Sequence, residues 1–282
     1  MASISKYKKN ISYGKITILA HTLMLFVSLL FGTTTCLAAG IGQNTGIPDT
    51  IIAGCELDYP PYCFVNEEGE ADGFSVELFR AAANEMGLKV AFKTGSWNKL
   101  KYDLPKGKLD ALPLVGRTPE REEMYDFTFP YMTMHGAIVV RKDGDTIHSV
   151  NDLTGKEVAV MKGDNAEEFL RRNNLNAEII QRTTFKRALK ELNAGEHDAV
   201  VIQRLLALQL IRENGYSNLK IIGDVAGMYK QSFCFAVKNG NEELLSLLNG
   251  GLSIVNTNGT FRQLHAKWFA PLESTAESRQ RI

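Results

Sequence analysis

The sequence Thr118-Pro119-Glu120-Arg121 is followed closely by Asp126-Phe127-Thr128-Phe129-Pro130-Tyr131. Trp97 stands upstream of this stretch, and an apolar run typical of a strand, residues 137–140, stands downstream. A guanidinium presents a fixed fork of donors that matches a carboxylate, and it keeps its charge near neutral pH. An arbitrary arginine at a helix start is usually a surface residue. Arg121 is therefore either such a surface residue or a residue that binds a carboxylate, and the pattern around it decides between the two.

Strand-like and helix-like segments alternate along the chain, which is typical of an α/β protein with largely parallel sheets. Apolar runs predict strands at residues 50–55, 88–92, 109–112, 157–161, 199–202 and 233–237. Helical spacing predicts helices at residues 74–86, 165–172, 184–194, 204–214, 242–256 and 260–268.

One pattern occurs twice. Leu104-x-x-Gly107-x-x-Asp110-Ala111-Leu112 in the first half is matched by Leu192-x-x-Gly195-x-x-Asp198-Ala199-Val200 in the second. In both, a helix is expected to end at glycine and a buried strand to begin at aspartate. Two similar α/β lobes would produce this repeat, although such junctions also recur by chance in α/β folds. Pro105 predicts that the first of these helices ends early.

Five motifs carry a family resemblance over most of the chain. In order they are Tyr59-Pro60-Pro61-Tyr62-Cys63-Phe64, Gly73-Phe74-Ser75-Val76-Glu77-Leu78, Thr118 to Arg121, Asp126 to Tyr131, and Gly259-Thr260-Phe261 with Lys267-Trp268-Phe269. Residues 51–269 resemble the family 3 periplasmic solute-binding proteins, the amino-acid-type binding proteins of bacterial uptake systems. The resemblance implies a type II-like periplasmic binding fold, in which two α/β lobes joined by a two-strand hinge close on a small ligand.

The resemblance also implies an order of domains. We expect a leader at residues 40–49, lobe 1 at 50–131 and 232–271, and lobe 2 at 136–226. The hinge segments would be residues 132–135 and 227–231, and residues 272–282 would form a polar tail.

Residues 1–39 have the features of a secretory signal: four lysines, an apolar core at residues 18–31 and small residues before a cleavage site after Ala39. A retained anchor, or lipidation at Cys36, is the alternative. Cleavage would lower the basic count from 32 to 28 against 32 acidic residues. A net charge near −4 argues against a nucleic-acid partner and against attraction to an anionic membrane. We expect a monomer in the periplasm.

The cysteines and histidines do not show the spacing of metal ligands, and no metal or other cofactor is expected. In an oxidising compartment Cys55 and Cys63 could form a disulfide or stay apart, with Cys234 as a buried apolar residue.

The resemblance implies where the ligand binds. Arg121 would hold a ligand carboxylate, with Leu114, Gly116 and Thr118 lining the same wall. Trp97 would either stack on the ligand or pack in the core. Glu56 and Tyr59, just after the first strand, would reach the cleft from the opposite side. In the second lobe, Asp164 and Asn165 would contact the ligand or only cap the helix that follows them.

One residue departs from the family pattern. Amino-acid binders of this family usually place an aspartate after Asp-Ala-Val-Val to pair with the ligand's α-ammonium, and this chain has Gln203. Glutamine accepts a hydrogen bond but carries no charge. The ligand is therefore either a carboxylate without a free ammonium or an amino acid whose ammonium meets Glu56 or Asp164.

Three functions are consistent with these residues. The first is a non-catalytic binding protein that serves an ABC-type transporter. The second is a binding protein that reports its ligand to a separate signalling receptor. The third is an enzyme, because a few relatives of this fold dehydrate cyclic carboxylic acids, and Glu56 or Asp164 would then supply the acid. We expect no catalytic residues, because the motifs of common hydrolases and nucleotide enzymes do not occur.

Overall fold

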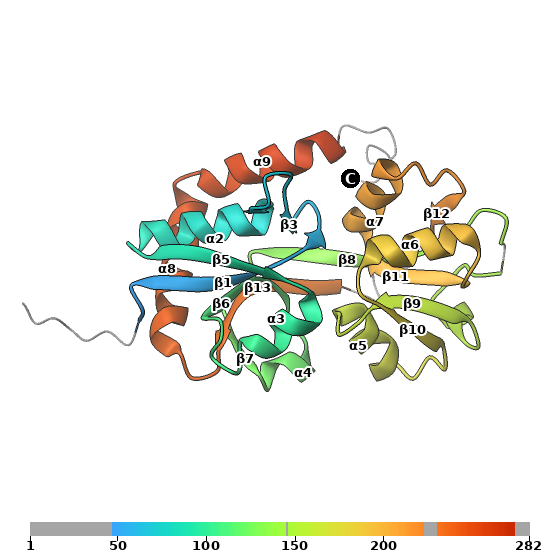
Figure 1. Cartoon of the computed structure of the whole chain (residues 1–282), viewed down its shortest axis with the longest axis horizontal. Helices are drawn as coiled ribbons and strands as arrows, with labels where there is room; N and C mark the ends of the chain where they lie inside the picture. Colours follow the sequence, from blue (N-terminus) through green and yellow to red (C-terminus); the bar gives the residue numbers. More distant parts are fainter. Residues whose placement is uncertain (1–46, 145, 223–229, 274–282) are drawn as a thin grey trace, which may run out of the picture. The chain divides into compact units, whose positions relative to one another are not determined.

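A computed structural model of the chain describes residues 47–144, 146–222 and 230–273 (Figure 1). The predicted signal sequence, most of the leader, residues 227–229 of the hinge and residues 274–282 of the tail lie outside this part. The main sheet has the strand order β10-β9-β11-β8-β13-β6-β1-β5, with β12 beside β8 and β7 beside β13. Its strands are β1 (Thr50–Glu56), β5 (Lys89–Gly95), β6 (Ala111–Gly116), β7 (Tyr125–Phe127), β8 (Met132–Arg141), β9 (Glu157–Met161), β10 (Glu178–Arg182), β11 (Ala199–Gln203), β12 (Leu219–Ile221) and β13 (Lys230–Lys238).

The sheet consists of two equivalent halves, which are the two predicted lobes. In lobe 1, β5, β1 and β6 run parallel, and β13 and then β7 follow in antiparallel pairing. In lobe 2, β10, β9 and β11 run parallel, and β8 and then β12 follow in the same antiparallel manner. Each lobe therefore takes its first antiparallel strand from a segment that has just crossed from the other lobe. The predicted two-lobed α/β fold is confirmed.

Strands β8 and β13 connect the lobes. Residues 132–135 of β8 pair with residues 230–233 of β13, while the rest of β8 pairs with β11 in lobe 2. The predicted hinge segment at residues 132–135 thus lies in the ladder that joins the two halves. The domain boundaries themselves remain a prediction.

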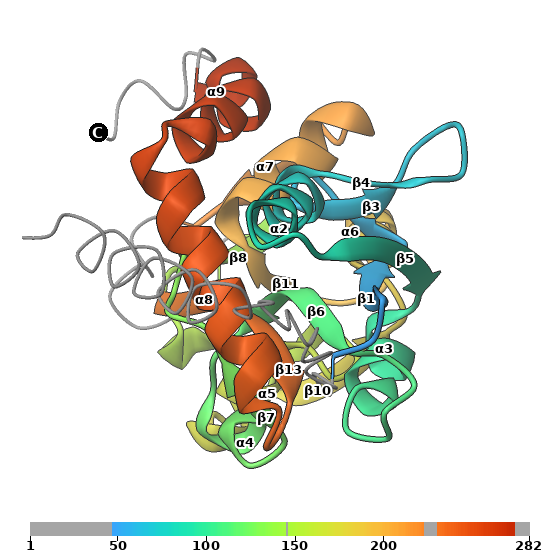
Figure 2. The same ribbon diagram turned by 90° about the vertical axis from the view of Figure 1, so that its left-hand side faces the viewer.

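Helices cover both faces of this sheet. They are α2 (Phe74–Glu85), α3 (Trp97–Asp103), α4 (Pro119–Glu122), α5 (Asn165–Arg172), α6 (Phe185–Ala194), α7 (Arg204–Glu213), α8 (Glu242–Thr257) and α9 (Thr260–Glu273), with a short 3₁₀ helix at Asn151–Leu153. Helices α8 and α9 pack with α2 on lobe 1, as the sequence predicts (Figure 2). Helix α3 ends at Asp103, before Pro105, which confirms the early end of that helix. No helix in the described ranges combines the length and the apolar character needed to cross a bilayer.

Several short elements do not appear in the sequence-based prediction. A three-stranded sheet consists of β2 (Asp58–Tyr59), β3 (Cys63–Val65) and β4 (Ala71–Asp72), and the chain between them turns at a cis Pro60–Pro61 bond. Strands β7, β10 and β12 and helix α4 are also additional. Elements of two to five residues are too short to show a hydrophobic period.

Candidate ligand-binding site

The predicted site residues come together between the lobes. A small cavity of about 10 Å³ is lined by eight of the ten predicted residues and by Phe233, and its lining is Glu56, Tyr59, Trp97, Leu114, Gly116, Arg121, Asp164, Asn165 and Phe233. Apart from Phe233, these residues stand near or beyond the carboxyl ends of β1, β5, β6 and β9, where α/β folds place their ligands. Phe233 was missed because it lies inside β13, in an apolar run that indicates only a core strand.

Arg121 is the centre of this arrangement. Its residue is 1% exposed, so a charged side chain is almost wholly removed from solvent. The guanidinium donates from Nε to Glu168 Oε1 at 3.1 Å, from Nη1 to the Gly116 carbonyl at 3.1 Å and from Nη2 to the Gly163 carbonyl at 3.2 Å. These bonds use three of the five N–H groups of the side chain. These acceptors hold the guanidinium in one orientation, and its remaining N–H groups are free of bulk solvent and available to a ligand.

Trp97 and Gly163 complete the surroundings of the guanidinium. The Arg121 Cζ lies 4.9 Å from the centre of the Trp97 ring, a cation–π arrangement. The indole Nε1 donates to the Gly163 carbonyl at 2.7 Å. Trp97 therefore stacks on Arg121 at the cavity wall and supports the arginine. Its stacking on a ligand stays a prediction.

Glu168 and Lys101 are not among the residues predicted from the sequence. Lys101 Nζ donates to Glu168 Oε1 at 2.7 Å, and Thr118 Oγ1 donates to Glu168 Oε2 at 3.0 Å. Thr118 thus faces Glu168 and is not part of the cavity lining. No local sequence signal marks Glu168, because a Glu167-Glu168 pair in the first turn of a helix is ordinary charge complementation of the helix dipole.

Two carboxyl groups line the cavity together with Arg121. Glu56 is 8% exposed, and within the described residues its carboxylate forms no hydrogen bond or ion pair. Burial, with further repulsion from Asp164, raises the pKa of Glu56 well above its ordinary value. Burial also raises the pKa of Asp164 to about 6, against attraction by Arg121. Because burial disfavours the negative charge of Glu56 and of Asp164, a cation bound between the two carboxyl groups would stabilise both.

Asp164, Asn165 and Gln203 belong to lobe 2. Asp164 caps α5, because its Oδ1 accepts from the Ala166 N–H at 2.9 Å, and it also lines the cavity. Gln203 is fully buried and donates from Nε2 to Asn165 Oδ1 at 2.8 Å. Gln203 does not line the Arg121 cavity; it holds Asn165, which does. The glutamine therefore acts on this cavity through its neighbour.

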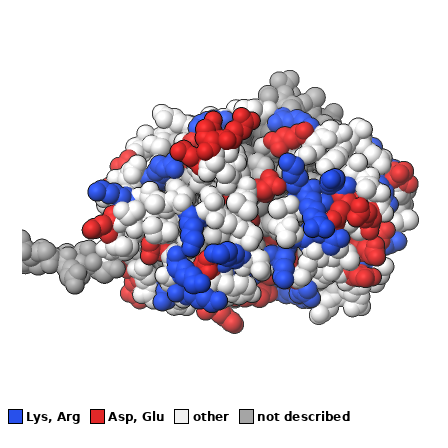
Figure 3. All heavy atoms as spheres, in the orientation of Figure 1, with Lys and Arg blue, Asp and Glu red and all other residues white. Residues whose placement is uncertain are grey.

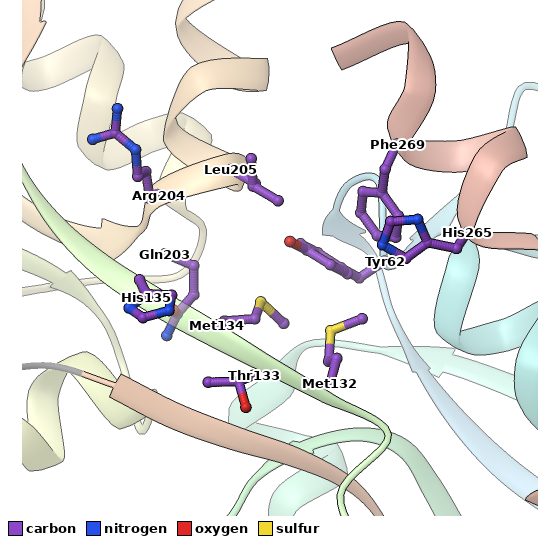
Figure 4. A pocket seen from close by; sticks show the side chains of 10 residues that line it. All are labelled: Tyr62, Met132, Thr133, Met134, His135, Gln203, Arg204, Leu205, His265 and Phe269. Atoms are coloured by element: carbon purple, nitrogen blue, oxygen red, sulfur yellow. The ribbon is translucent and has the colours of Figure 1, made fainter. Parts of the chain in front are cut away.

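A larger cavity of about 290 Å³ lies at the hinge strand β8 (Figure 4). Its lining includes Met132, Met134 and His135 of β8, residues 203–205 at the start of α7, and Tyr62, His265 and Phe269 of lobe 1. Gln203 stands between the two cavities. Among the described residues, the lining of the hinge cavity contains no acidic side chain; it combines thioether and aromatic groups with two histidines and Arg204. It therefore lacks the paired charges of the Arg121 cavity.

The cysteines and the charged surface complete the description. Cys55, Cys63 and Cys234 are buried and free, and the Cys63 Sγ lies 2.9 Å from the Cys55 Sγ as two unjoined thiols. No group of three or more His, Cys, Asp or Glu side chains suited to a metal ion occurs in the described part. Acidic and basic side chains are interspersed on the face shown in Figure 3.

The two-lobed sheet, the hinge ladder and the charged cavity between the lobes define a class of protein, the two-lobed solute-binding proteins. The chain belongs to the bacterial extracellular solute-binding proteins, family 3, whose sequence profile matches residues 51–271. It is 31% identical over 223 residues to the L-cystine-binding protein TcyJ of Escherichia coli (strain K12), covering 78% of this chain and 82% of that protein.

Solved structures agree with this membership. An ancestral arginine-binding protein bound to arginine superimposes with a TM-score of 0.73 at 33% identity, over 79% of this chain and 99% of the other. A histidine kinase sensor domain with similarity to periplasmic binding proteins superimposes with a TM-score of 0.74 at 32% identity, over 78% of this chain and 95% of the other. The names of these relatives describe binding proteins and a sensor domain.

Proposed function

We propose that this protein captures an amino acid or a closely related carboxylate ligand between its lobes and presents it to an ABC-type transporter. The observation that carries the proposal is the buried Arg121 in one cavity with the carboxyl groups of Glu56 and Asp164. The similarity to a cystine-binding and an arginine-binding protein supports an amino-acid ligand. The family supports a periplasmic location, and we propose that the protein acts there as a monomer.

The charges assign a role to each wall. The ligand carboxylate binds the guanidinium of Arg121, where charge-assisted hydrogen bonds in a dry site are strong. The ligand ammonium lies between Glu56 and Asp164, whose carboxyl groups are otherwise poorly compensated. This arrangement replaces the usual aspartate after Asp-Ala-Val-Val, since Gln203 is engaged with Asn165. The cavity of about 10 Å³ is too small for an amino acid, so the lobes must stand further apart around the ligand than in this structure. Partial closure on the ligand follows because the ligand contacts both lobes.

A thermal-shift screen of residues 40–282 tests the proposal. The panel contains α-amino acids, dicarboxylates, and cyclic or aromatic carboxylates. We expect a zwitterion to raise the melting temperature of the parent protein and not that of Arg121→Ala or Glu56→Gln. Arg117→Ala is the matched control, because Arg117 pairs with Glu122 at the exposed surface and should leave the shift intact. A shift that survives Arg121→Ala would contradict the carboxylate assignment.

The alternative, ligand sensing through a separate receptor, draws on the likeness to a histidine kinase sensor domain. Ligand-loaded protein that stimulates a reconstituted permease supports transport, and ligand-loaded protein that activates only a receptor supports sensing.

We also propose that the protein is not an enzyme. Recovery of the bound ligand unchanged, as followed by NMR, supports that view, and its conversion to a dehydrated product would contradict it.

A further inference from the structure

Helix α5 presents one face to lobe 1. Residues 165, 168 and 172 recur at the spacing of a single helical face. Asn165 packs so closely against Gly116 that a Cβ on this glycine would lie 2.5 Å from the Asn165 Nδ2. Arg172 Nη1 donates to both carboxylate oxygens of Glu120 in α4, at 2.9 and 3.0 Å. Between these two contacts stands Glu168.

Within the described residues, every hydrogen bond to the Glu168 carboxylate comes from lobe 1. Its Oε1 accepts from Lys101 Nζ and Arg121 Nε, and its Oε2 accepts from Thr118 Oγ1. The Glu168 side chain is 12% exposed, and those of Lys101 and Arg121 are 9% and 2% exposed. The Glu120–Arg172 pair is much more exposed, at 44% and 38%. Exposed pairs contribute little, so the buried cluster at Glu168 dominates this face.

The loop before α5 reinforces the cluster. The Gly163 carbonyl accepts from Trp97 Nε1 at 2.7 Å, from Lys101 Nζ at 3.1 Å and from Arg121 Nη2 at 3.2 Å. Glu168 and Gly163 of lobe 2 therefore receive six hydrogen bonds from lobe 1, three each. Nε and Nη2, which form the side-on fork of the guanidinium, both point to lobe 2.

The charges make this cluster depend on one carboxylate. Lys101 and Arg121 are two buried cations that meet at Oε1 of Glu168. Both cations belong to lobe 1, so without that negative charge lobe closure would bury Lys101 and Arg121 against lobe 2 with no carboxylate bridging them. Removing one partner of a buried ion cluster is strongly unfavourable for the state that buries it.

We propose that Glu168 is a latch: its carboxylate holds the two lobes closed on its own account by bridging Lys101, Arg121 and Thr118. The latch works whatever ligand the cleft takes. If the experiment contradicts the latch, the proposed ligand binding is unaffected. If the ligand-binding proposal is contradicted, the latch is likewise unaffected. Opening of the cleft requires these hydrogen bonds to break first.

Trp97 reports on the latch, because its indole takes part in the closed cluster. The chain has two tryptophans, so Trp268→Phe leaves Trp97 as the single tryptophan, which is excited selectively at the red edge where tyrosine does not absorb. In this background and with no ligand added, acrylamide quenching of Trp97 and the radius of gyration from small-angle X-ray scattering are compared among variants. Acrylamide is uncharged, so changes of local charge do not alter its access.

We expect Glu168→Gln to lower the ratio of closed to open protein by about tenfold or more, seen as stronger quenching and a larger radius of gyration. Glu167→Gln is the matched control, because among the described residues the Glu167 side chain bonds to Gly163 N, Arg171 and Gln181, all in lobe 2, and to no group of lobe 1. Thr118→Val removes one of the three hydrogen bonds to Glu168 and should give a smaller change in the same direction, which keeps the test valid if Glu168→Gln folds poorly. Quenching and size unchanged in both Glu168→Gln and Thr118→Val would overturn the latch.

Discussion

Asp110 and Asp198 occupy the same position in the two lobes. Asp110 Oδ2 accepts from the Ile52 N–H at 2.7 Å, and its own N–H donates to the Ile52 carbonyl at 2.9 Å. Asp198 Oδ2 accepts from the Glu157 N–H at 3.0 Å, and its own N–H donates to the Glu157 carbonyl at 3.0 Å. Each aspartate thereby joins the start of the third parallel strand of its lobe to the first.

We predict that Asp110→Ala and Asp198→Ala each lower the free energy of unfolding by about 1–2 kcal/mol, because each leaves a strand N–H without its acceptor. Urea denaturation measures the change. Glu67→Ala is the control: Glu67 lies in an exposed turn, its side chain forms no ion pair or hydrogen bond within the described residues, and the change should stay within about 0.5 kcal/mol. Equal effects for all three variants would show that the two aspartates are ordinary surface residues.

This repeat shows why the architecture was predictable from the sequence. A glycine followed three residues later by an aspartate at the start of a buried strand is a local signal, and both glycines adopt positive φ, 68° at Gly107 and 85° at Gly195. Gly195 caps α6, whereas Gly107 lies in the turn after α3, which already ends at Asp103. Individual strands and helices follow from such local signals, whereas the hinge crossings and the residues of the cavity lining were implied by the family resemblance. The short sheet β2-β3-β4 carries no comparable period, because its strands are only two or three residues long.

The site was predictable only in part, for a different reason. Arg121 stands in a recognisable motif, and its neighbours in the chain follow from it. Glu168 lies 47 positions away and meets Arg121 only because α5 docks its inward face on lobe 1. Lys101 likewise lies in α3 with no motif of its own. A contact made by tertiary packing leaves no trace in the local sequence.

The packing of α8 on α2 depends on one of two adjacent glycines. A Cβ at Gly251 would lie 2.0 Å from the carbonyl oxygen of Ala82 in α2, so the backbone itself blocks a side chain there. We predict that Gly251→Ala lowers the free energy of unfolding by about 3 kcal/mol or more, because the two helices must move apart.

Gly250→Ala is the natural counterpart for that experiment. Its Cβ would meet only the flexible end of Met86, at 3.4 Å, and alanine favours a helix over glycine by about 1 kcal/mol. Thermal denaturation of both variants should therefore show opposite signs. If both variants lost the same amount of stability, the close approach of Gly251 to Ala82 would not explain the effect.

The thiols of Cys55 and Cys63 are placed for oxidation. Their sulfur atoms are 2.9 Å apart, against about 2.05 Å in a disulfide, so only a small side-chain movement separates the two states. We predict that protein secreted into an oxidising compartment contains the Cys55–Cys63 disulfide and a free Cys234. Peptide mass mapping without reduction checks this pairing. If Cys55, Cys63 and Cys234 were all alkylated after the secreted protein is denatured without a reductant, the predicted pairing would be contradicted.

The buried carboxyl group of Asp164 should make stability fall as pH rises. Burial raises its folded-state pKa from 3.8 to about 6, so the folded protein holds this proton more tightly than the unfolded chain does. The cost of ionising Asp164 is therefore absent below about pH 4, grows between pH 4 and 6, and is fully present above that range. Asp164→Asn keeps the oxygen that accepts from Ala166 N–H and removes the charge. We predict that this variant is more stable than the parent at pH 7, by up to about 3 kcal/mol.

Glu167 supplies a control of opposite sign close by in the same helix. Burial works against its ionisation, but hydrogen bonds from Gly163 N–H and Arg171 outweigh it and lower the pKa of Glu167 below the ordinary value. Its contribution to stability is thus present at pH 7 and is lost as pH falls through its folded-state pKa. Urea unfolding at pH 7 should show Asp164→Asn gaining and Glu167→Gln losing stability. At about pH 4 and below both differences should shrink, because the parent carboxyl groups become protonated. The contradicting result is an Asp164→Asn variant that is less stable than the parent at pH 7. The folded protein would then stabilise the ionised Asp164, most directly by attraction to Arg121. Asp164 would in that case be compensated by Arg121, and Glu56 alone would remain to bind the ligand ammonium.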